Sequence, residues 1–596
     1  MRTHASTFLT ALSLSFLLSS ASAAQNLLTN GDAEAGPLDQ PPPSWTSRGW
    51  DAAKNEKSSD FPLSTVPGGH AGQKAIRLAC PDVLQWTYVQ QVFDVPAERR
   101  VVCKFSVWLR SDSELPKSVD LALLPGDAQT KFDQVRKRFD VGTSWSQCSI
   151  DMPVSPLLDH DGKPVLDAND KPIPWKVRSI IQLYAHASIL IDDASVFLVQ
   201  PTAAEKREAE TLAALDAKYP GIESPVARKG AFLDMPDGRI LGFNADFSVR
   251  ESSDGGKTWS EPRPLDLPDK TNTLSGAILM KNGAVGIYTE SWGAAMCFWK
   301  SADAGKSWSK RITIGPTGAP LHGTLMIETA DGRLAIPVRT GHTIPQRLLK
   351  TAFGSRAGER VPIESHAHNM EMDVTFVYYS TDSGEKWRRS EGDVIIWKDD
   401  GLGGMWPCDE PNLVELKDGR LMLFLRTTLG RLYQAISPDG GVTWDYPTPT
   451  DLPSSYSPCS LKRVPDNDYT RKTGRAGDLL CLWNNVSADE IKRGWRRGRL
   501  SSAVSIDDGV TWTHVRTVDS AGLPPLDDVA PLSEPAMVRA DDDVGELPMP
   551  FGNVSYPDVA FVGSNVFVRY LKDIINPDLP RSMKLRILPL DWFYGD

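Results

Sequence analysis

The chain has 596 residues and a formal net charge of −11 at pH 7, with 41% hydrophobic and 24% charged residues. A single compact core does not usually extend over this length, so we expect at least two domains. The acidic balance argues against a nucleic-acid-binding surface, which would be basic, and it favours solubility.

The first residues, MRTHASTFLTALSLSFLLSSASAAQ, have the pattern of a secretory signal peptide. Arg2 supplies the positive charge, and the apolar run Phe8–Leu18 is too short to span a bilayer. Residues 21–23, Ala-Ser-Ala, match a cleavage site with small side chains. We therefore predict a signal peptide over residues 1–23 and a secreted or periplasmic protein without a membrane span; a buried N-terminal helix is the alternative.

Residues 26–200 have the alternating or continuous apolar pattern of β-strands, in stretches such as YVQQVFDV, VVCKFSVWLRS, VDLALLP and SILIDDASVFLV. No long amphipathic helix interrupts them, which predicts a β-sandwich. The opening NLLTNGDAEAG and the closing ILIDDASVFLV resemble the jelly-roll carbohydrate-binding modules of secreted glycosidases. We interpret residues 159–172, DHDGKPVLDANDKP, as a long hairpin with a solvated loop, a calcium site being the alternative.

The seven cysteines are odd in number, and their spacing fits no metal motif. We assign no disulfide and expect most of these thiols to be buried as small hydrophobic side chains.

Residues 201–224, PTAAEKREAETLAALDAKYPGIES, are rich in Ala, Glu and Lys. The stretch AAEKREAETLAALDAK predicts a short helix, which Pro220 and Gly221 end. We place the linker between the two domains here, so that the second domain covers residues 225–596.

One octet of the form Ser-x-Asp-x-Gly-x-x-Trp occurs five times in the second domain. Its copies are SSDGGKTW at Ser252, SADAGKSW at Ser301, STDSGEKW at Ser380, SPDGGVTW at Ser437 and SIDDGVTW at Ser505. The Asp can fix a turn, the Gly allows the chain to reverse, and the Trp can pack between neighbouring sheets. Because one active site cannot use five copies, we interpret the octet as a structural element.

Each octet follows an apolar strand, and the repeat distances are those of propeller blades with insertions. A sixth set of strands, DVAFVGSNVFVRYLKD and MKLRILPLDWF, ends the chain without an octet. The sequence thus predicts an all-β protein, with a jelly-roll β-sandwich followed by a six-bladed β-propeller.

The octet is identified as the Asp-box, and from Val226 to Phe593 the chain resembles the sialidase superfamily. The resemblance implies a site with three arginines that bind the substrate carboxylate, because guanidinium pairs with carboxylate through two parallel hydrogen bonds. It also implies a Tyr nucleophile, a Glu that acts as its base and an Asp that acts as acid and base. The octet indicates the fold more than the function, which depends on the site.

The resemblance assigns the first arginine to Arg228 in VARKGAFLDMPDGRILGF, where Lys229 and Gly230 replace the family's Ile-Pro. The Glu and the second arginine fall on Glu410 and Arg426, in CDEPNLVELKDGRLMLFLRTTLGRLYQAIS. Each of these residues also has a plain interpretation as a surface charge at a strand end.

The third arginine falls on Arg497 in WRRGRLSSAVSIDDGVTW, with Arg496 and Arg499 as competing assignments. The nucleophile falls on Tyr556 in NVSYPDVAFV. The acid falls on Asp246, the only Asp near the short connection GFNADFSVR. If Asp246 is not the acid, the chemistry differs from sialic acid hydrolysis.

In the segment ESHAH, His366 and His368 could contact a metal ion, but no third ligand is in register, and a loop bordering the site is the simpler interpretation. No cofactor is implied. The sequence predicts a secreted exo-acting glycoside hydrolase of the sialidase type, whose partner is a sialylated or other acidic glycan. A glycosidase or lyase for another uronic-type sugar, and a glycan-binding protein without catalysis, are the alternatives.

Overall fold

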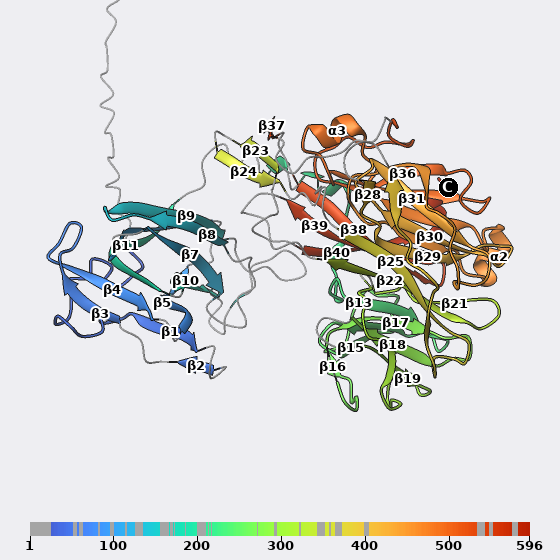
Figure 1. Cartoon of the computed structure of the whole chain (residues 1–596), viewed down its shortest axis with the longest axis horizontal. Helices are drawn as coiled ribbons and strands as arrows, with labels where there is room; N and C mark the ends of the chain where they lie inside the picture. Colours follow the sequence, from blue (N-terminus) through green and yellow to red (C-terminus); the bar gives the residue numbers. More distant parts are fainter. Residues whose placement is uncertain are drawn as a thin grey trace, which may run out of the picture. The chain divides into compact units, whose positions relative to one another are not determined.

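The computed structural model describes residues 26–595 except 52–55, 59–62, 82–83, 96–100, 114–115, 126–134, 155–165, 167–170, 172, 185, 200–209, 212–213, 216, 271, 291–294, 321–322, 343–351, 357–358, 364–371, 399–403, 533–542, 548–551 and 575–581. The predicted signal peptide and most of the hairpin 159–172 lie outside these residues. The structure is all-β, as predicted, and divides into two compact units between Thr202 and Ala203 (Figure 1). This division falls inside the segment interpreted as the linker.

The first unit contains two antiparallel sheets. The six-stranded sheet has the order β2-β1-β5-β10-β7-β8. Its strands are β1 Thr46–Asp51, β2 Glu56–Ser58, β5 Leu84–Val95, β7 Lys117–Pro125, β8 Val135–Val141 and β10 Trp175–Tyr184. The five-stranded sheet has the order β3-β4-β11-β6-β9. Its strands are β3 Leu63–Pro67, β4 Lys74–Cys80, β6 Val101–Ser111, β9 Ser146–Val154 and β11 Ala187–Val199.

One hydrophobic cluster joins the two sheets of this unit. It includes Val89 and Val177 from the first sheet and Phe105 and Ile189 from the second, all fully buried. The stretch that opens the unit is attached to the strand that closes it, because the Leu27 amide donates to the Val196 carbonyl over 2.9 Å. The two sequence stretches that frame the predicted sandwich therefore meet in the structure.

The second unit contains six four-stranded antiparallel sheets, shown from green to red in Figure 1. Their orders are β13-β14-β15-β16, β17-β18-β19-β20, β21-β22-β25-β26, β29-β30-β31-β32, β33-β34-β35-β36 and β12-β40-β39-β38. The strands of the first three sheets are β13 Gly230–Asp234, β14 Ile240–Asn244, β15 Ser248–Ser252, β16 Arg263–Pro264, β17 Leu274–Leu279, β18 Val285–Thr289, β19 Met296–Ser301, β20 Ile312–Gly315, β21 Ile327–Glu328, β22 Leu334–His342, β25 Met372–Ser380 and β26 Arg388–Arg389. Those of the last three are β29 Asp409–Glu415, β30 Leu421–Arg426, β31 Arg431–Ser437, β32 Thr448–Pro453, β33 Ser460–Arg463, β34 Leu479–Trp483, β35 Arg499–Ser505, β36 Thr513–Ser520, β12 Ile222–Glu223, β38 Gly552–Val562, β39 Asn565–Ile574 and β40 Ser582–Pro589.

Smaller elements connect these sheets. They are the strands β23 Ala352–Arg356, β24 Glu359–Ile363 and β37 Asp543–Glu546, the hairpin of β27 Ile396–Lys398 and β28 Gly404–Trp406, the helices α2 Asp468–Thr473 and α3 Ala488–Lys492, and the 3₁₀ turn η2 Leu590–Tyr594. In the predicted linker helix, residues 210–211, 214–215 and 217–218 are helical, and the positions between them lie outside the described residues.

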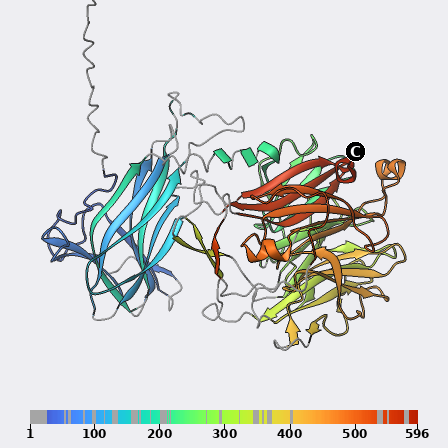
Figure 2. The same ribbon diagram turned by 90° about the horizontal axis from the view of Figure 1, so that it is seen from above.

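The sheets of the second unit contact one another in a cyclic order. Strand β13 contacts β17, β22 contacts β29, β29 contacts β33, β33 contacts β38, and β38 contacts β13. The second and third sheets are linked by a hydrogen bond from the Ala277 amide to the Gly323 carbonyl. The chain also begins and ends this unit in one sheet, since β12 pairs with β40 through Ile222 and Leu585. Figure 2 shows the red final strands beside green segments from the start of the unit.

Each octet forms the turn after the third strand of its sheet, at the ends of β15, β19, β25, β31 and β35. In the fourth copy, the Ser437 hydroxyl donates to Asp439, and Asp439 accepts the Thr443 amide over 2.9 Å and the Thr443 hydroxyl over 2.6 Å. The octet tryptophans are half-buried, and Trp308 meets Phe243 of the preceding sheet edge-on. The octet therefore closes its own turn and packs one sheet on the next, as predicted.

All seven cysteines are buried, as expected from their pattern. The helices in the described part of the chain are all too short or too polar to cross a membrane.

Candidate active site

Two strands of the second unit carry the same local irregularity, and each places one predicted catalytic residue. In β29 the pairing register shifts between Asp409 and Asn412, and Glu410 lies there with a φ of 41°. In β38 the register shifts between Ser555 and Asp558, and Tyr556 lies there with a φ of 55°. A β-bulge of this kind turns a side chain away from the regular pleat.

Both residues precede a proline, Pro411 and Pro557. A residue before proline is disfavoured in the right-handed helical region, and proline has no amide hydrogen for the sheet ladder. The left-handed conformation of a residue other than glycine costs on the order of 1 kcal/mol, and such strain concentrates at functional sites. These two strained positions therefore support the assignment of Glu410 and Tyr556.

Two of the predicted arginines flank the ring of Tyr556. The guanidinium carbon of Arg228 lies 4.7 Å from the ring centroid, and that of Arg497 lies 5.2 Å from it. The ring itself is buried, with 7% of its surface exposed. Neither arginine forms an ion pair with any residue in the described ranges. Their positive charges are therefore available to an anionic ligand beside Tyr556.

The third predicted arginine, Arg426, has a carboxylate partner within the protein. Its guanidinium forms an ion pair with Glu410, and it lies 3.9 Å from Asp409. Burial acts to lower the pKa of Arg426, but the negative charge of Glu410 raises it well above the usual value. Tyr456 and Tyr556 also interact electrostatically with this guanidinium, so all three arginines lie around Tyr556.

Four further residues form a polar ring next to Arg426, and the sequence analysis did not identify them. Arg339 contacts Asp409 over 3.0 Å and Asp373 over 3.1 Å. The Tyr456 hydroxyl lies 3.0 Å from Asp409 and 3.3 Å from Asp373, which closes the ring. Burial and the adjacent Glu410 raise the pKa of Asp409 in spite of its two arginine neighbours.

A sequence signal for Arg339 does exist. The segment DGRLAIPVRT, residues 331–340, has the same pattern as DGRLMLFLRT, residues 418–427, so that Arg339 and Arg426 occupy equivalent positions in the second strands of their sheets. In the second sheet the equivalent position, after NGAVGIYT, is Glu290, which forms an ion pair with Lys229 next to Arg228. The equivalent positions in these three sheets thus all carry charged side chains.

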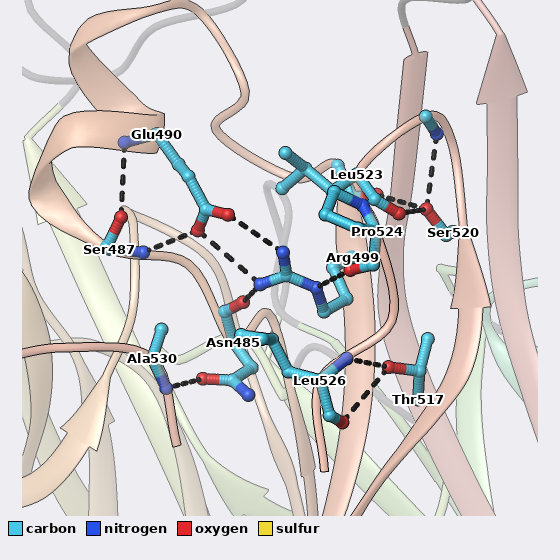
Figure 3. A network of polar contacts seen from close by, with 12 residues as sticks. Asn485, Ser487, Glu490, Arg499, Thr517, Ser520, Leu523, Pro524, Leu526 and Ala530 are labelled. Carbon is cyan, nitrogen blue, oxygen red and sulfur yellow. Dashed lines mark hydrogen bonds and ion pairs between the residues drawn. The ribbon is translucent and has the colours of Figure 1, made fainter. Parts of the chain in front are cut away.

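The structure also separates the competing arginines of β35 and its preceding turn. Arg499 is fully buried, and its guanidinium donates to Glu490 over 2.8 Å, to the Asn485 carbonyl over 2.6 Å and to the Pro524 carbonyl over 2.7 Å (Figure 3). Its donors face internal acceptors, which marks it as a structural residue. Arg496 is buried, and its carbonyl accepts the Ser455 hydroxyl. Arg497 lies beside the ring of Tyr556, and the internal hydrogen bonds of Arg499 remove it as a competing assignment.

Asp246 is exposed, in the turn between β14 and β15. Its carboxylate accepts the Ser248 amide over 3.0 Å and the Ser248 hydroxyl over 2.7 Å. This turn lies at the same sheet end as Arg228, since Gly230 pairs with Asn244. The described hydrogen bonds of Asp246 are thus within its own turn, and the structure brings it into no contact with Tyr556 or Glu410.

A further pair fixes the segment that carries Arg228. Arg569, which is 1% exposed, donates to the carbonyls of Ala227 and Gly230 over 2.6 and 2.7 Å. It also pairs with Asp558 over 2.5 Å, two residues after Tyr556. The Arg228 segment and the Tyr556 strand are therefore tied to one buried ion pair.

Metal-binding groups are not gathered in the described part of the chain, where no cluster of three or more His, Cys, Asp or Glu side chains has a suitable arrangement. The segment ESHAH, with His366 and His368, lies outside the described residues.

Residues 283–568 match the model of a BNR repeat-like domain. The chain is 26% identical over 331 residues to a sialidase of Micromonospora viridifaciens, an alignment that covers 49% of this chain. Both matches are consistent with a relation to the sialidase/BNR superfamily. The alignment spans 45% of the length of that relative.

Among solved structures, the chain is similar to the leech intramolecular trans-sialidase, at 12% identity and a TM-score of 0.39 over 84% of this chain and 95% of that one. It is also similar to the NanB sialidase of Streptococcus pneumoniae, at 12% identity and a TM-score of 0.38 over 82% and 95% of the two chains.

Proposed function

We propose that the protein is a glycoside hydrolase that removes a terminal acidic sugar, of the sialic acid type, from glycans. The observation that carries the proposal is the position of Arg228 and Arg497 against the ring of Tyr556, without carboxylate partners among the described residues. Guanidinium groups bind carboxylates strongly and with defined geometry. The match to a BNR repeat-like domain and the similarity to a sialidase support a glycosidase-type function.

In the proposed reaction, Arg228, Arg497 and Arg426 bind the carboxylate of the sugar. The Tyr556 oxygen attacks the anomeric carbon, and Glu410 accepts the phenol proton. A phenol suits this role because a carboxylate nucleophile would be repelled by the substrate carboxylate. Asp246 donates a proton to the leaving oxygen and then activates water, which gives retention of configuration.

The proposed reaction requires that Arg426 and Asp246 change their contacts when substrate binds. The guanidinium of Arg426 must loosen its ion pair with Glu410. It can then contact the sugar carboxylate, and Glu410 can accept the proton of Tyr556. Asp246 must direct its carboxylate away from Ser248 and toward the leaving group. Active-site hydrogen bonds often tighten only in the substrate complex.

We further propose that the six four-stranded sheets are the blades of a six-bladed β-propeller. The cyclic contacts and the pairing of β12 with β40 support this arrangement. The two sheets of the first unit are proposed to form a jelly-roll β-sandwich of the carbohydrate-binding type. The signal-peptide pattern of residues 1–23 supports a secreted or periplasmic location.

A second candidate is a glycosidase or lyase for a uronic-type sugar at the same site. The ion pair of Arg426 with Glu410 and the turn-bound Asp246 favour this candidate, because neither residue is arranged for sialic acid hydrolysis without a change. Such an enzyme would use the same two arginines beside Tyr556, Arg228 and Arg497, for the uronate carboxylate.

The test is to incubate the full chain with a fluorogenic α-sialoside and with a panel of uronate-containing glycans, with Tyr556→Phe as control. Release of fluorophore from the sialoside by the parent but not by the variant supports the proposal. Turnover of the uronates alone supports the second candidate. Binding of acidic glycans without any turnover contradicts both and indicates a glycan-binding protein.

A further inference from the structure

Tyr456 lies in the connection between β32 and β33 and contacts two of the predicted arginines. The guanidinium carbon of Arg426 lies 3.7 Å from the centroid of its ring. Arg497 donates through its terminal nitrogen to the Tyr456 carbonyl over 3.1 Å. One residue therefore holds a buried arginine of β30 against its ring and an arginine that precedes β35 against its backbone.

The hydroxyl end of Tyr456 is held as firmly as its ring. It lies 3.0 Å from Asp409 in β29 and 3.3 Å from Asp373 in β25, and both carboxylates are buried and bound by Arg339. A phenol hydroxyl can donate one hydrogen bond and can also accept hydrogen bonds. With both ends of the side chain fixed, the ring cannot turn without breaking polar contacts to two different strands.

The contact between the ring of Tyr456 and the guanidinium of Arg426 fixes the orientation of that guanidinium. A guanidinium over an aromatic face gains cation–π attraction, and this attraction increases where water is excluded. Arg426 is 3% exposed, so its planar group has little freedom beyond the ring of Tyr456 and the carboxylate of Glu410. Recognition of a carboxylate through two parallel hydrogen bonds depends on that plane.

We propose that Tyr456 is a positioning residue that holds Arg426 and Arg497 in the arrangement that receives the carboxylate of an acidic sugar. The inference rests on the proposed function, since it assigns the two arginines to a sugar carboxylate. The ring and the backbone position of Tyr456 carry this role, and the hydroxyl anchors the ring to Asp373 and Asp409.

Two substitutions separate these parts. Tyr456→Phe keeps the ring over Arg426 and the carbonyl under Arg497, whereas Tyr456→Leu removes the ring. Tyr446→Phe is the matched control, because Tyr446 is exposed and the hydrogen bonds of its hydroxyl with described residues are to the backbone of Trp397. Tyr456→Met replaces the Leu variant if thermal unfolding shows that the latter does not fold.

The first measurement is calorimetric binding of N-acetylneuraminate and D-glucuronate, each compared with its neutral methyl ester, to the full chain. We expect Tyr456→Leu to lose about tenfold in affinity for the acid that the parent binds, the size of a desolvated cation–π contact, and to keep its affinity for the ester. Tyr456→Phe and the control should stay near the parent. Undiminished acid binding by the Leu variant, or an equal loss for acid and ester, overturns the proposal.

The second measurement does not depend on sugar binding. Crystal structures of the parent, Phe and Leu variants should show the Arg426 guanidinium in the parental position in the first two and displaced in the third. If neither acid binds the parent, the proposed function fails, and these structures still decide whether Tyr456 positions the arginines. An Arg426 that keeps its position in the Leu variant overturns the positioning role.

Discussion

The octet turns and the candidate active site lie in the same sheets, yet their polar groups are satisfied in different ways. In the octets, each Asp is bound by residues at most four positions away, as Asp254 is by Ser252, Lys257 and Thr258. In the site, the contacts of Arg497, Arg426 and Tyr456 join residues that are 30 or more positions apart along the chain. The carboxylates of the octets are thus bound within their own turns, whereas the polar groups of the site depend on segments that only the folded unit brings together.

Left-handed backbone occurs in both regions, but in different settings. In every octet it falls on a glycine, such as Gly441 with a φ of 93°, and in three copies also on the residue before that glycine, Ala304, Ser383 or Asp508. In the site it falls on Glu410 and Tyr556. The octet positions belong to a tight turn between strands, whereas Glu410 and Tyr556 lie at a bulge inside a strand, which turns their side chains away from the regular pleat.

The largest effect that distinguishes the candidate active site from the octet turns is expected at Tyr556. We expect Tyr556→Phe to lower turnover of the preferred acidic glycoside by about a thousandfold or more, because the attacking oxygen is removed while the ring remains. Binding of the product sugar and the unfolding free energy should stay close to those of the parent. Near-normal turnover in steady-state assays contradicts the nucleophile assignment.

The same substitution at two nearby arginines should have opposite consequences. Arg499→Met breaks a buried ion pair with Glu490 and should lower the unfolding free energy by about 3 kcal/mol. Arg497→Met removes a buried cation without a described carboxylate partner and should be neutral or stabilising, while acid-sugar affinity falls about 10- to 100-fold. Urea unfolding and calorimetry measure the two effects, and a stability loss at Arg497 as large as at Arg499 contradicts this division.

The octets should affect stability alone. Asp439→Ala removes the acceptor of the Ser437 and Thr443 hydrogen bonds and should lower the unfolding free energy by about 1–2 kcal/mol. Activity per folded molecule should be unchanged in assays at low temperature. A fully stable but inactive variant would contradict the interpretation of the octet as a structural element.

The smallest expected effect is a pH dependence of the octet turns. The hydroxyl and amide of Thr258 lower the pKa of Asp254 to about 2, below its unfolded value of about 3.9. This depressed pKa contributes stability above pH 4 that is lost as the pH falls toward 2. The stability difference between the parent and Asp254→Asn should shrink over that range in urea titrations, and a constant difference contradicts the linkage.

The separation along the chain between contacting residues determines how much of the structure could be predicted from the sequence. The octets were predictable because all the groups that close each turn lie within eight residues. The assignments of Arg228, Glu410, Arg426 and Tyr556 rest on their order along strands and turns, and the structure places the two outer arginines, Arg228 and Arg426, near Tyr556. The short strand β12, in the segment interpreted as the linker, was not, because its partner β40 lies more than 350 residues away.

The polar ring of Arg339, Asp373, Asp409 and Tyr456 shows where sequence reasoning stopped. Its members come from two sheets and one connection, and no local pattern joins them. Only the repeated segment that ends in Arg339 and Arg426 gave a signal, and Asp409 adjoins the predicted Glu410. Asp246 was assigned by proximity in sequence, and its carboxylate is bound within its own turn.

The central claim is that Arg228 and Arg497, which have no carboxylate partner among the described residues, bind a sugar carboxylate beside Tyr556. The most direct measurement is the affinity of the full chain for N-acetylneuraminate and D-glucuronate against their methyl esters, in which the carboxylate is replaced by a neutral ester group. We predict that one free acid binds about tenfold or more tightly than its ester, and that Arg497→Met abolishes this difference. Equal affinity of acid and ester in both pairs contradicts the claim.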